Sequence, residues 1–247
     1  MKENSWNQFK SVFKKNIPRY WLDALGKYRY RHKKSDFEGK IIEQIFKEIY
    51  SRNYWRNTES VSGPGSTIST TQGIRSELEK LFSLFHIHSL IDAPCGDFNW
   101  MRKVGLGQID YLGLDIVPEI IETNTRNYSG VSVHFDIADI TKDHIPKADI
   151  IISRDCLVHF SFEDIFKTLN NFKNSGSTYL LTTSFAVPKL NYNITTGDWR
   201  PVNLLLPPFN FGPSLYQIAD HFKGPLAGDD LGKILGLWKL NELKIKD

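Results

Sequence analysis

Residues 91–98 read Ile-Asp-Ala-Pro-Cys-Gly-Asp-Phe, and residues 111–115 read Tyr-Leu-Gly-Leu-Asp. In this order the two stretches predict a strand, a glycine turn, a helix, a second strand and an acid at its end. The series is typical of a nucleoside-binding site, because a helix after the turn directs free N–H groups and its positive dipole end at a ligand anion. Asp115, at the end of the second strand, can then accept hydrogen bonds from both hydroxyls of a ribose.

The turn departs from the three-glycine fingerprint that lets a backbone approach a pyrophosphate. Pro94 and Phe98 occupy two positions where a glycine is expected, and Gly96 remains. A ligand without a pyrophosphate, which offers only an amino-acid carboxylate to the turn, tolerates these bulkier neighbours. S-adenosylmethionine is one such ligand.

With this series the chain resembles the class I S-adenosylmethionine-dependent methyltransferases, roughly from Tyr54 to the C-terminus. In that family the first-strand acid and the glycine turn face the methionyl part, the second-strand acid binds the ribose, and an Asp after the third strand meets the adenine. An upstream loop folds over the cofactor. The resemblance thus implies a set of cofactor-binding residues in this chain: Asp92, Pro94, Gly96, Asp115, Ile116, Asp139, Ile140, Arg154, Ser62, Gly63 and Ser66. Asp136 competes with Asp139, and either acid could instead only terminate the strand.

Four motifs further resemble a bacterial subgroup of these enzymes that is associated with capsule or lipopolysaccharide biosynthesis. They are Ser-Gly-Pro-Gly-Ser at 62–66, Asp-Ala-Pro-Cys-Gly-Asp-Phe-Asn-Trp-Met at 92–101, Arg-Asp-Cys-Leu-Val-His at 154–159 and Gly-Asp-Trp-Arg-Pro at 197–201. The subgroup implies a small-molecule or glycan-precursor acceptor, such as a sugar hydroxyl or amide, or a phosphoramidate group of a surface glycan. The chain lacks the Asn-Pro-Pro-Tyr signature of base methylation, so we do not expect a nucleic-acid base as acceptor.

Hydrophobic periodicity extends the alternation of strands and helices along the chain. It predicts strands at 89–93, 111–115, 131–135, 149–153, 178–183 and 235–240, and helices at 37–50, 71–85, 98–104, 118–128, 162–172 and 214–221. Strands separated by helices imply a parallel sheet with right-handed crossovers. With the resemblance, we expect an α/β fold: a Rossmann-like, seven-stranded, mostly parallel sheet with helices on both faces, an antiparallel last strand and an N-terminal helical extension.

Two parts of the chain are expected. Residues 1–70 form a basic, aromatic, helical extension that ends in a cofactor-covering loop, and residues 71–247 form the methyltransferase domain. A polar and aromatic insertion at about 185–212 interrupts the alternation, and long loops of this kind usually serve function.

The composition suits a globular protein: 247 residues, 40% hydrophobic and 13% aromatic, are enough for a full core. No apolar run is long enough to span a membrane, and lysines interrupt residues 1–17 where a signal peptide has its apolar centre. We therefore expect a cytoplasmic protein. The two cysteines, Cys95 and Cys156, suit reduced thiols, and no spacing predicts a metal site.

Basic residues concentrate near the N-terminus. Residues 1–40 hold eleven Lys or Arg and four Asp or Glu, a net charge of +7 in a chain whose net charge is +3. Aromatic residues interleave with them, most densely at 28–34, Tyr-Arg-Tyr-Arg-His-Lys-Lys. Residues 1–35 could contact nucleic acid, an anionic membrane surface or an acidic partner, or could be a solvated extension with docked aromatics. Two alternative functions follow: an RNA methyltransferase, and a non-catalytic nucleoside-binding module that docks through this segment.

Methyl transfer from a sulfonium depends mainly on alignment, and a base matters for hydroxyl acceptors, which we favour over amines. His159 and Asp155 follow the fourth strand, at the sheet edge where ligands sit, and are the candidate catalytic residues. Each has a structural alternative: His159 could hold a loop through a backbone hydrogen bond, and Asp155 could contact the cofactor or acceptor. Arg154 could simply pair with a nearby acid.

The insertion carries the candidate substrate-binding residues Asp198, Trp199, Arg200 and Asn203. Trp199 could stack on a sugar face, and Arg200 could clamp a phosphate or carboxylate at two points. The alternative is a buried network of Asp198 and Arg200 that stabilises the loop.

Overall fold

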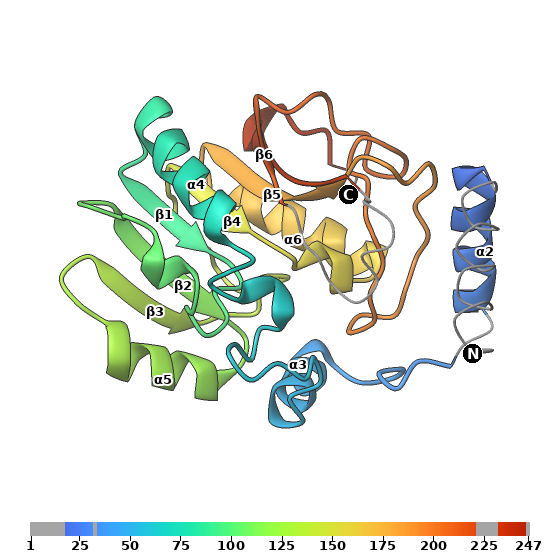
Figure 1. The fold of residues 1–247 in the computed structure, drawn as a ribbon, viewed down its shortest axis with the longest axis horizontal. Helices are drawn as coiled ribbons and strands as arrows, with labels where there is room; N and C mark the ends of the chain where they lie inside the picture. The colour runs from blue at the N-terminus through green and yellow to red at the C-terminus, as the bar shows by residue number, and fades with distance from the viewer. Residues whose placement is uncertain (1–17, 32–33, 221–231, 246–247) are drawn as a thin grey trace, which may run out of the picture.

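The computed structural model describes residues 18–31, 34–220 and 232–245. Its centre is a seven-stranded sheet in the order β3-β2-β1-β4-β5-β7-β6 (Figure 1). The strands are β1 Ser89–Asp92, β2 Asp110–Asp115, β3 Val133–Ile137, β4 Ile150–Ser153, β5 Tyr179–Phe185, β6 Tyr216–Ala219 and β7 Lys233–Lys239. The pairs among β1 to β5 are parallel, whereas β7 runs antiparallel to both β5 and β6. The expected mostly parallel sheet with an antiparallel last strand is confirmed.

The helices surround this sheet. They are α2 Arg19–Arg31, α3 Ile42–Ser51, α4 Gln72–Leu84, α5 Pro118–Tyr128 and α6 Phe162–Asn174, with single 3₁₀ turns at Pro64–Ser66, Met101–Lys103, Leu157–His159 and Leu240–Glu242. None of the described helices is long and apolar enough to cross a membrane. Pro118 occupies the first turn of α5, where its missing N–H costs no helical hydrogen bond.

Each face of the sheet has its own core, because successive side chains of a strand point to opposite faces. On one face, Leu90, Ile150 and Ile152 pack with the buried residues of α4. On the other, Ile91 and Ile151 pack with the buried residues of α6. All four residues of β4 are buried, as expected for a central parallel strand covered on both faces.

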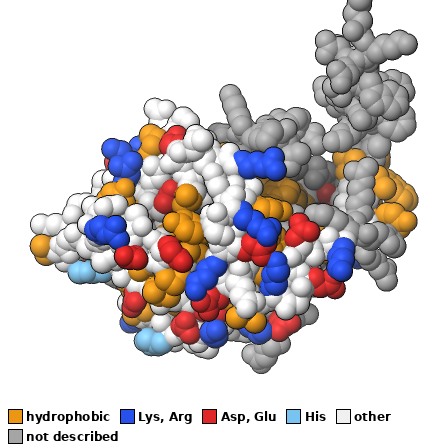
Figure 2. Space-filling model, turned by 90° about the horizontal axis from the view of Figure 1, so that it is seen from below, with side chains coloured by type: hydrophobic (Ala, Val, Ile, Leu, Met, Phe, Trp, Pro, Cys, Tyr) orange, Lys and Arg blue, Asp and Glu red, His pale blue; other side chains and the backbone are white. Residues whose placement is uncertain are grey.

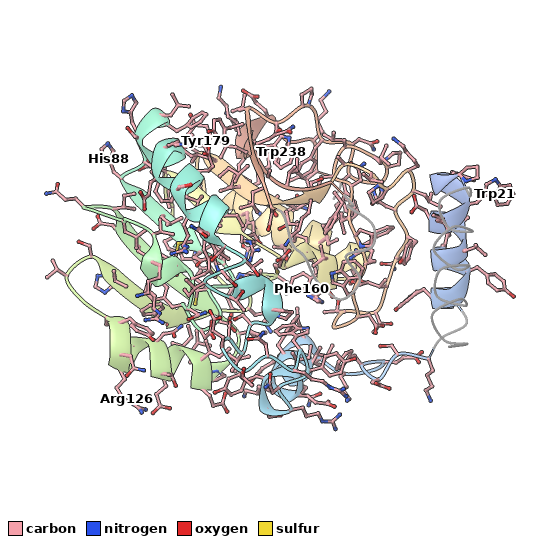
Figure 3. All side chains as sticks on the ribbon, viewed as in Figure 1. Trp21, His88, Arg126, Phe160, Tyr179 and Trp238 are labelled. Carbon is pink, nitrogen blue, oxygen red and sulfur yellow. The ribbon has the colours of Figure 1, made fainter. Side chains whose placement is uncertain are left out.

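The insertion that follows β5 packs into the core on the face of the sheet that α6 covers. Val202, Leu204, Phe209 and Phe211 are buried in the cluster that contains α6. The ring of Phe211 lies 5.4 Å from that of Trp238, which Figure 3 shows beside the C-terminal strands. The backbone of the insertion is therefore fixed by packing.

Two predicted helices are wrong. The segment 98–104 forms only the 3₁₀ turn Met101–Lys103, because Phe98 takes a positive φ of 56° and the segment buries Phe98, Trp100, Met101 and Val104 in the α4 core. No α-helix follows the glycine turn, so its dipole cannot serve the ligand. In place of a helix at 214–221 the structure has β6, where Ile218 alone is buried between two exposed neighbours and pairs with Leu235 of β7; His221 lies outside the described residues.

The N-terminal part lies against the insertion and the cavity described below. Helix α2 stands at one end of the molecule beside the insertion, and α3 lies below the sheet (Figure 1). The predicted helix 37–50 begins only at Ile42, since residues before it form a turn that buries Phe37.

Figure 2 shows the molecule from below, on the side of α3 and α5, with basic and acidic side chains interspersed. Ion pairs account for part of this mixture, such as Lys47–Glu43 at 2.6 Å and Arg126–Glu122 at 2.8 Å. Over its described residues this face offers no continuous basic track of the kind that binds a phosphate backbone.

Candidate functional site

A cavity of about 660 Å³ lies at the carboxyl ends of β1, β2 and β4, where ligands bind in open α/β sheets. Helix α3, the loop 61–66 and the 3₁₀ turn after β4 close its other sides. All eleven predicted cofactor-binding residues line this cavity, and so do both predicted catalytic residues, His159 and Asp155. Topology has thus brought together residues that are spread from position 62 to position 159.

Asp115 ends β2 in the wall of this cavity. Its Oδ2 accepts the N–H of Gly96 at 3.1 Å and its Oδ1 accepts that of Val117 at 3.0 Å. Burial raises the pKa of Asp115 to about 6, against the lowering effect of these N–H donors. The N–H of Ile116 also contacts this carboxylate. A carboxylate has about four acceptor positions, so the three backbone donors leave one for a ligand hydroxyl.

Asp92 ends β1 and is 2% exposed. Its Oδ2 accepts the hydroxyl of Tyr111 at 2.9 Å. Burial raises the pKa of Asp92 to about 7, and the neighbouring carboxylate of Asp115 adds to the rise. The cavity therefore holds two acids that share one small, poorly solvated region.

The structure separates the two candidate acids after β3. Asp139 is buried in the cavity wall, whereas Asp136 is exposed and does not line the cavity. Oδ1 of Asp139 accepts the N–H and the hydroxyl of Thr141, and Lys142 lies 3.2 Å from Oδ2. Asp139 thus stabilises the turn that follows β3, and it also lines the cavity beside Ile140.

The loop 60–66 is fastened onto the glycine turn by Asp97. Its carboxylate accepts the Ser60 hydroxyl at 3.0 Å, the Val61 N–H at 2.9 Å and the Ser62 hydroxyl at 3.4 Å. Gly96 has a φ of 54°, and a Cβ there would lie 2.1 Å from Ser62 Oγ. Glycine is therefore required both by the turn and by the loop that covers it.

Four charged side chains form a cluster at one side of the cavity, in which Arg154 and Asp220 are buried and Asp155 is partly exposed. Arg154 donates two hydrogen bonds to Asp220, at 3.0 and 3.2 Å, and Lys233 contacts both Asp220 and Asp155 within 3 Å. Burial would raise the pKa of Asp155, but Lys233 and Arg154 outweigh it and hold that pKa well below its usual range. Asp155 also takes a φ of 55°. A carboxylate stabilised in this way is a poor acceptor of protons.

His159 is oriented by the insertion. Its Nδ1 lies 2.9 Å from the carbonyl oxygen of Asp198, and its ring lies 5.4 Å from that of Trp55. A carbonyl only accepts, so Nδ1 carries the hydrogen and Nε2 keeps the lone pair. Burial lowers the pKa of His159 below its usual range, which keeps the imidazole neutral at pH 7.

The insertion places its four predicted residues in two groups. Trp199 lines the cavity, and both Asp198 and Trp199 line a smaller hollow of about 430 Å³ beside it. Arg200 and Asn203 line neither. Arg200 is fully buried and donates to the carbonyls of residues 157, 158, 160 and 192, while Asn203 donates to the carbonyl of residue 188. Arg200 therefore stabilises the loop, which was the alternative to substrate binding, but its partners are backbone carbonyls and not Asp198.

Sequence reasoning missed several cavity residues: Trp55, Trp100, Asp220 and Lys233, as well as Asp97 behind the glycine turn. The guanidinium of Arg154 lies over the ring of Trp100, 5.4 Å from its centre. The charged cluster therefore contacts the segment that follows the glycine turn. Asp97 could have been found, since it follows the turn glycine directly. Asp220 follows the end of β6 and Lys233 begins β7, and neither gives a local signal in the sequence.

No group of three or more His, Cys, Asp or Glu side chains could hold a metal ion within residues 18–31, 34–220 and 232–245. Cys95 and Cys156 line the cavity as free, buried thiols.

No protein-family model and none of the curated proteins matches the sequence. Solved structures do match. Human N-acetylserotonin methyltransferase in complex with S-adenosylmethionine superposes with a TM-score of 0.51 at 16% identity, over 88% of this chain and 66% of that one, just under two thirds. The chain has a methyltransferase fold.

Two further structures agree with that fold. A protein described for the conversion of a disulfide bond into a thioacetal group during echinomycin biosynthesis gives a TM-score of 0.56 at 16% identity, over 80% of this chain and 92% of that one. The methyltransferase domain of a bacterial Hen1 gives 0.51 at 9% identity, over 69% and 99%. At these identities the likeness establishes the fold alone.

Proposed function

We propose that this protein is a methyltransferase that uses S-adenosylmethionine. The observation that carries the proposal is the cavity at the strand ends, which gathers all eleven residues expected at the cofactor. The domain division at residue 70 belongs to the same proposal: the loop 60–66 covers the site from the N-terminal side.

The donor set of the cavity fits this cofactor. Asp115 would accept a ribose hydroxyl beside its backbone contacts. Ile116 and Ile140 would flank the adenine, with Asp139 at its edge, and residues 92–96 would face the methionyl part. When bound, the cofactor supplies a methyl group on a positively charged sulfur, activated for transfer. The residues of the chain bind the cofactor and the acceptor, orient them toward each other and exclude water.

His159 is the proposed base for a hydroxyl acceptor. The bond from Nδ1 to the Asp198 carbonyl fixes the ring and leaves Nε2 to take the acceptor's proton as the oxygen attacks. Asp155 is poorly suited to this step, because Lys233 and Arg154 stabilise its charged form. The structural role expected for His159 and its catalytic role are thus compatible, since one bond serves both.

The proposed acceptor is a small polar group of a glycan, with O-methylation favoured over N-methylation. Support comes from Asp198 and Trp199, which stand beside His159 at the edge of the cavity. A phosphoramidate acceptor, a capsule pathway and a cytoplasmic location stay predictions from the resemblance and the composition.

The first test is thermal unfolding with S-adenosylhomocysteine, with NAD and without ligand, for the native chain and for Asp115→Ala. A ligand that binds only the folded state adds about 2.7 kcal/mol of stability at a hundredfold excess over its Kd. We expect stabilisation by S-adenosylhomocysteine alone, and its loss in Asp115→Ala. Absence of any shift would reject the cofactor and favour the non-catalytic module.

Helix α2 suggests where the enzyme works. Trp21, Leu25 and Tyr28 follow the i, i+4, i+7 spacing of one helical face, and all three are exposed. Trp21 points away from the rest of the molecule (Figure 3). In the sequence, residues 1–40, which include this helix, carry a net charge of +7. Interleaved aromatic and basic residues suit an anionic lipid surface, where rings sit at the headgroup level and charges meet lipid phosphates.

Sedimentation with vesicles tests this second proposal. The native chain should bind vesicles that contain anionic lipid and not neutral ones, and Trp21→Ala together with Tyr28→Ala should release it. Equal binding to neutral vesicles, or binding to RNA with a steep salt dependence in place of vesicle binding, would overturn it.

A further inference from the structure

The smaller hollow beside His159 is built by parts of the chain that are far apart in sequence. It is lined by Tyr30, Tyr54, Trp55, His159, Gly197, Asp198 and Trp199. Trp55, His159 and Trp199 also line the larger cavity, so the two spaces meet at the proposed base. A molecule in the hollow would therefore present one end to His159.

Three of the seven residues that line this hollow come from the N-terminal part. Tyr30 of α2 donates its hydroxyl to Oδ2 of Asp198 at 3.2 Å and accepts the N–H of Thr195. Asp23 lies on the same face of α2 as Tyr30, and its carboxylate accepts the N–H of Lys189 at 2.7 Å. These contacts fasten α2 to the insertion and place Tyr30 in the wall of the hollow.

The other N-terminal residues follow α3. The ring of Trp55 lies 5.4 Å from that of His159, and the ring of Tyr54 lies 5.6 Å from that of Phe37. Gly63 lets the covering loop approach this wall, since a Cβ there would lie 3.2 Å from Cβ of Trp55. The loop over the larger cavity and the wall of the hollow are thus in contact.

The chemistry of the lining narrows the class of ligand. Four aromatic rings, one carboxylate and one neutral imidazole surround the space, and none of the described residues that line it is Lys or Arg. Arg200, which follows Trp199 in the sequence, does not reach the hollow, because its guanidinium is buried on backbone carbonyls. Electron-rich ring faces and a carboxylate oppose an anionic ligand.

An uncharged sugar fits a lining of aromatic rings, one carboxylate and one imidazole. The C–H faces of a sugar ring are weakly positive and rest against an indole or phenol face, and its hydroxyls donate to a carboxylate. Trp199 and Tyr54 are 44% and 42% exposed, which leaves their rings accessible. The volume of about 430 Å³ lies in the range of small-molecule sites.

We propose that this hollow is the acceptor site and that it selects an uncharged sugar residue, whose hydroxyl is directed at His159 by rings of the N-terminal part and the insertion. The inference rests on the proposed methyltransferase function. In the transfer, the bond from the sugar oxygen to the methyl carbon forms as the carbon–sulfur bond of the cofactor breaks. The hydroxyl proton goes to Nε2 of His159, and the sulfur leaves as a neutral thioether.

The test compares methyl glycosides with their uronate, phosphate and amino counterparts. Binding is followed by ligand-observed NMR, and methyl transfer by the radiolabel from S-adenosylmethionine. The variants are Trp199→Ala and Tyr54→Ala, and the matched control is Tyr20→Ala, which changes an exposed tyrosine that lines neither space. Affinity for S-adenosylhomocysteine is measured for every variant.

At least one neutral glycoside should bind tenfold more tightly than its charged counterparts. Trp199→Ala should weaken that binding tenfold or more, whereas Tyr20→Ala should leave it unchanged. Tighter binding of an amino sugar or uronate, equal binding by Trp199→Ala, or no binding of any neutral glycoside would overturn the inference. If S-adenosylhomocysteine still binds in that case, the proposed function survives and the acceptor class alone is rejected. If it does not bind, the proposed function itself fails.

Discussion

The two sides of His159 are built in different ways. On the cofactor side, the candidate residues stand at strand ends, and the register of parallel strands sets their positions. On the acceptor side, α2, the segment after α3 and the insertion meet through side-chain contacts such as that of Tyr30 with Asp198. A site made by a sheet edge is readable from sequence, whereas one made by docked loops depends on packing that no local pattern encodes.

The adjacent residues Trp199 and Arg200 give the largest expected difference in the free energy of unfolding. Arg200→Ala should lower the free energy of unfolding by about 3–5 kcal/mol, because four buried carbonyls lose their donors and a cavity opens. Trp199→Ala should cost less than about 1 kcal/mol, since the ring is half exposed. Urea denaturation followed by circular dichroism measures both. Equal costs would show that the insertion is held in another way.

His159→Gln tests the residue where the two sides meet. With an acceptor from the glycoside screen, kcat should fall about 10²–10⁴-fold, because glutamine cannot take the proton. Affinity for S-adenosylhomocysteine should be unchanged. A kcat within a few-fold of the native value would restrict His159 to holding the insertion through the Asp198 carbonyl.

Asp115→Asn tests the cofactor side. Affinity for S-adenosylhomocysteine should weaken about 10–100-fold, the scale of hydrogen bonds to a charged group. In the native chain the same affinity should fall as the pH drops through about 6, where Asp115 takes up a proton and accepts fewer hydrogen bonds. Calorimetric titration at several pH values measures both effects. Asp136→Asn, outside the cavity, is the matched control and should change neither.

The smallest expected effect is a change in the free energy of unfolding with pH, which Asp92 causes. Its pKa rises from 3.8 to about 7 on folding, so between these values the native state holds a proton that the unfolded state has lost. Stability should therefore fall as the pH rises from about 4 to about 7, by an amount on the order of 1–3 kcal/mol. Asp92→Asn keeps an acceptor for Tyr111 and should flatten the slope in urea titrations. An unchanged slope would assign it to other groups.

Much of the fold was predictable, and the exceptions have local causes. Strands such as 111–115 and helices such as 118–128 have a periodicity that packing then satisfies. The segment 98–104 has helical spacing, but the aromatic cluster under the turn draws Phe98 into a positive φ. Residues 214–221 could be a helix by composition, and pairing with β7 makes part of them a strand, because an open sheet edge leaves β7 with unpaired N–H and carbonyl groups.

By itself the sequence determined the α/β order, the glycine turn and the acids that follow the strands, because strand ends and turns are local and a parallel sheet brings them to one edge. Only the tertiary structure decided which polar residues of the insertion reach a cavity. Trp199 and Arg200 are adjacent in the chain, yet one lines the cavity and the other is buried on carbonyls. Burial of a charge requires several partners at once, and these come from segments that only the folded chain brings together.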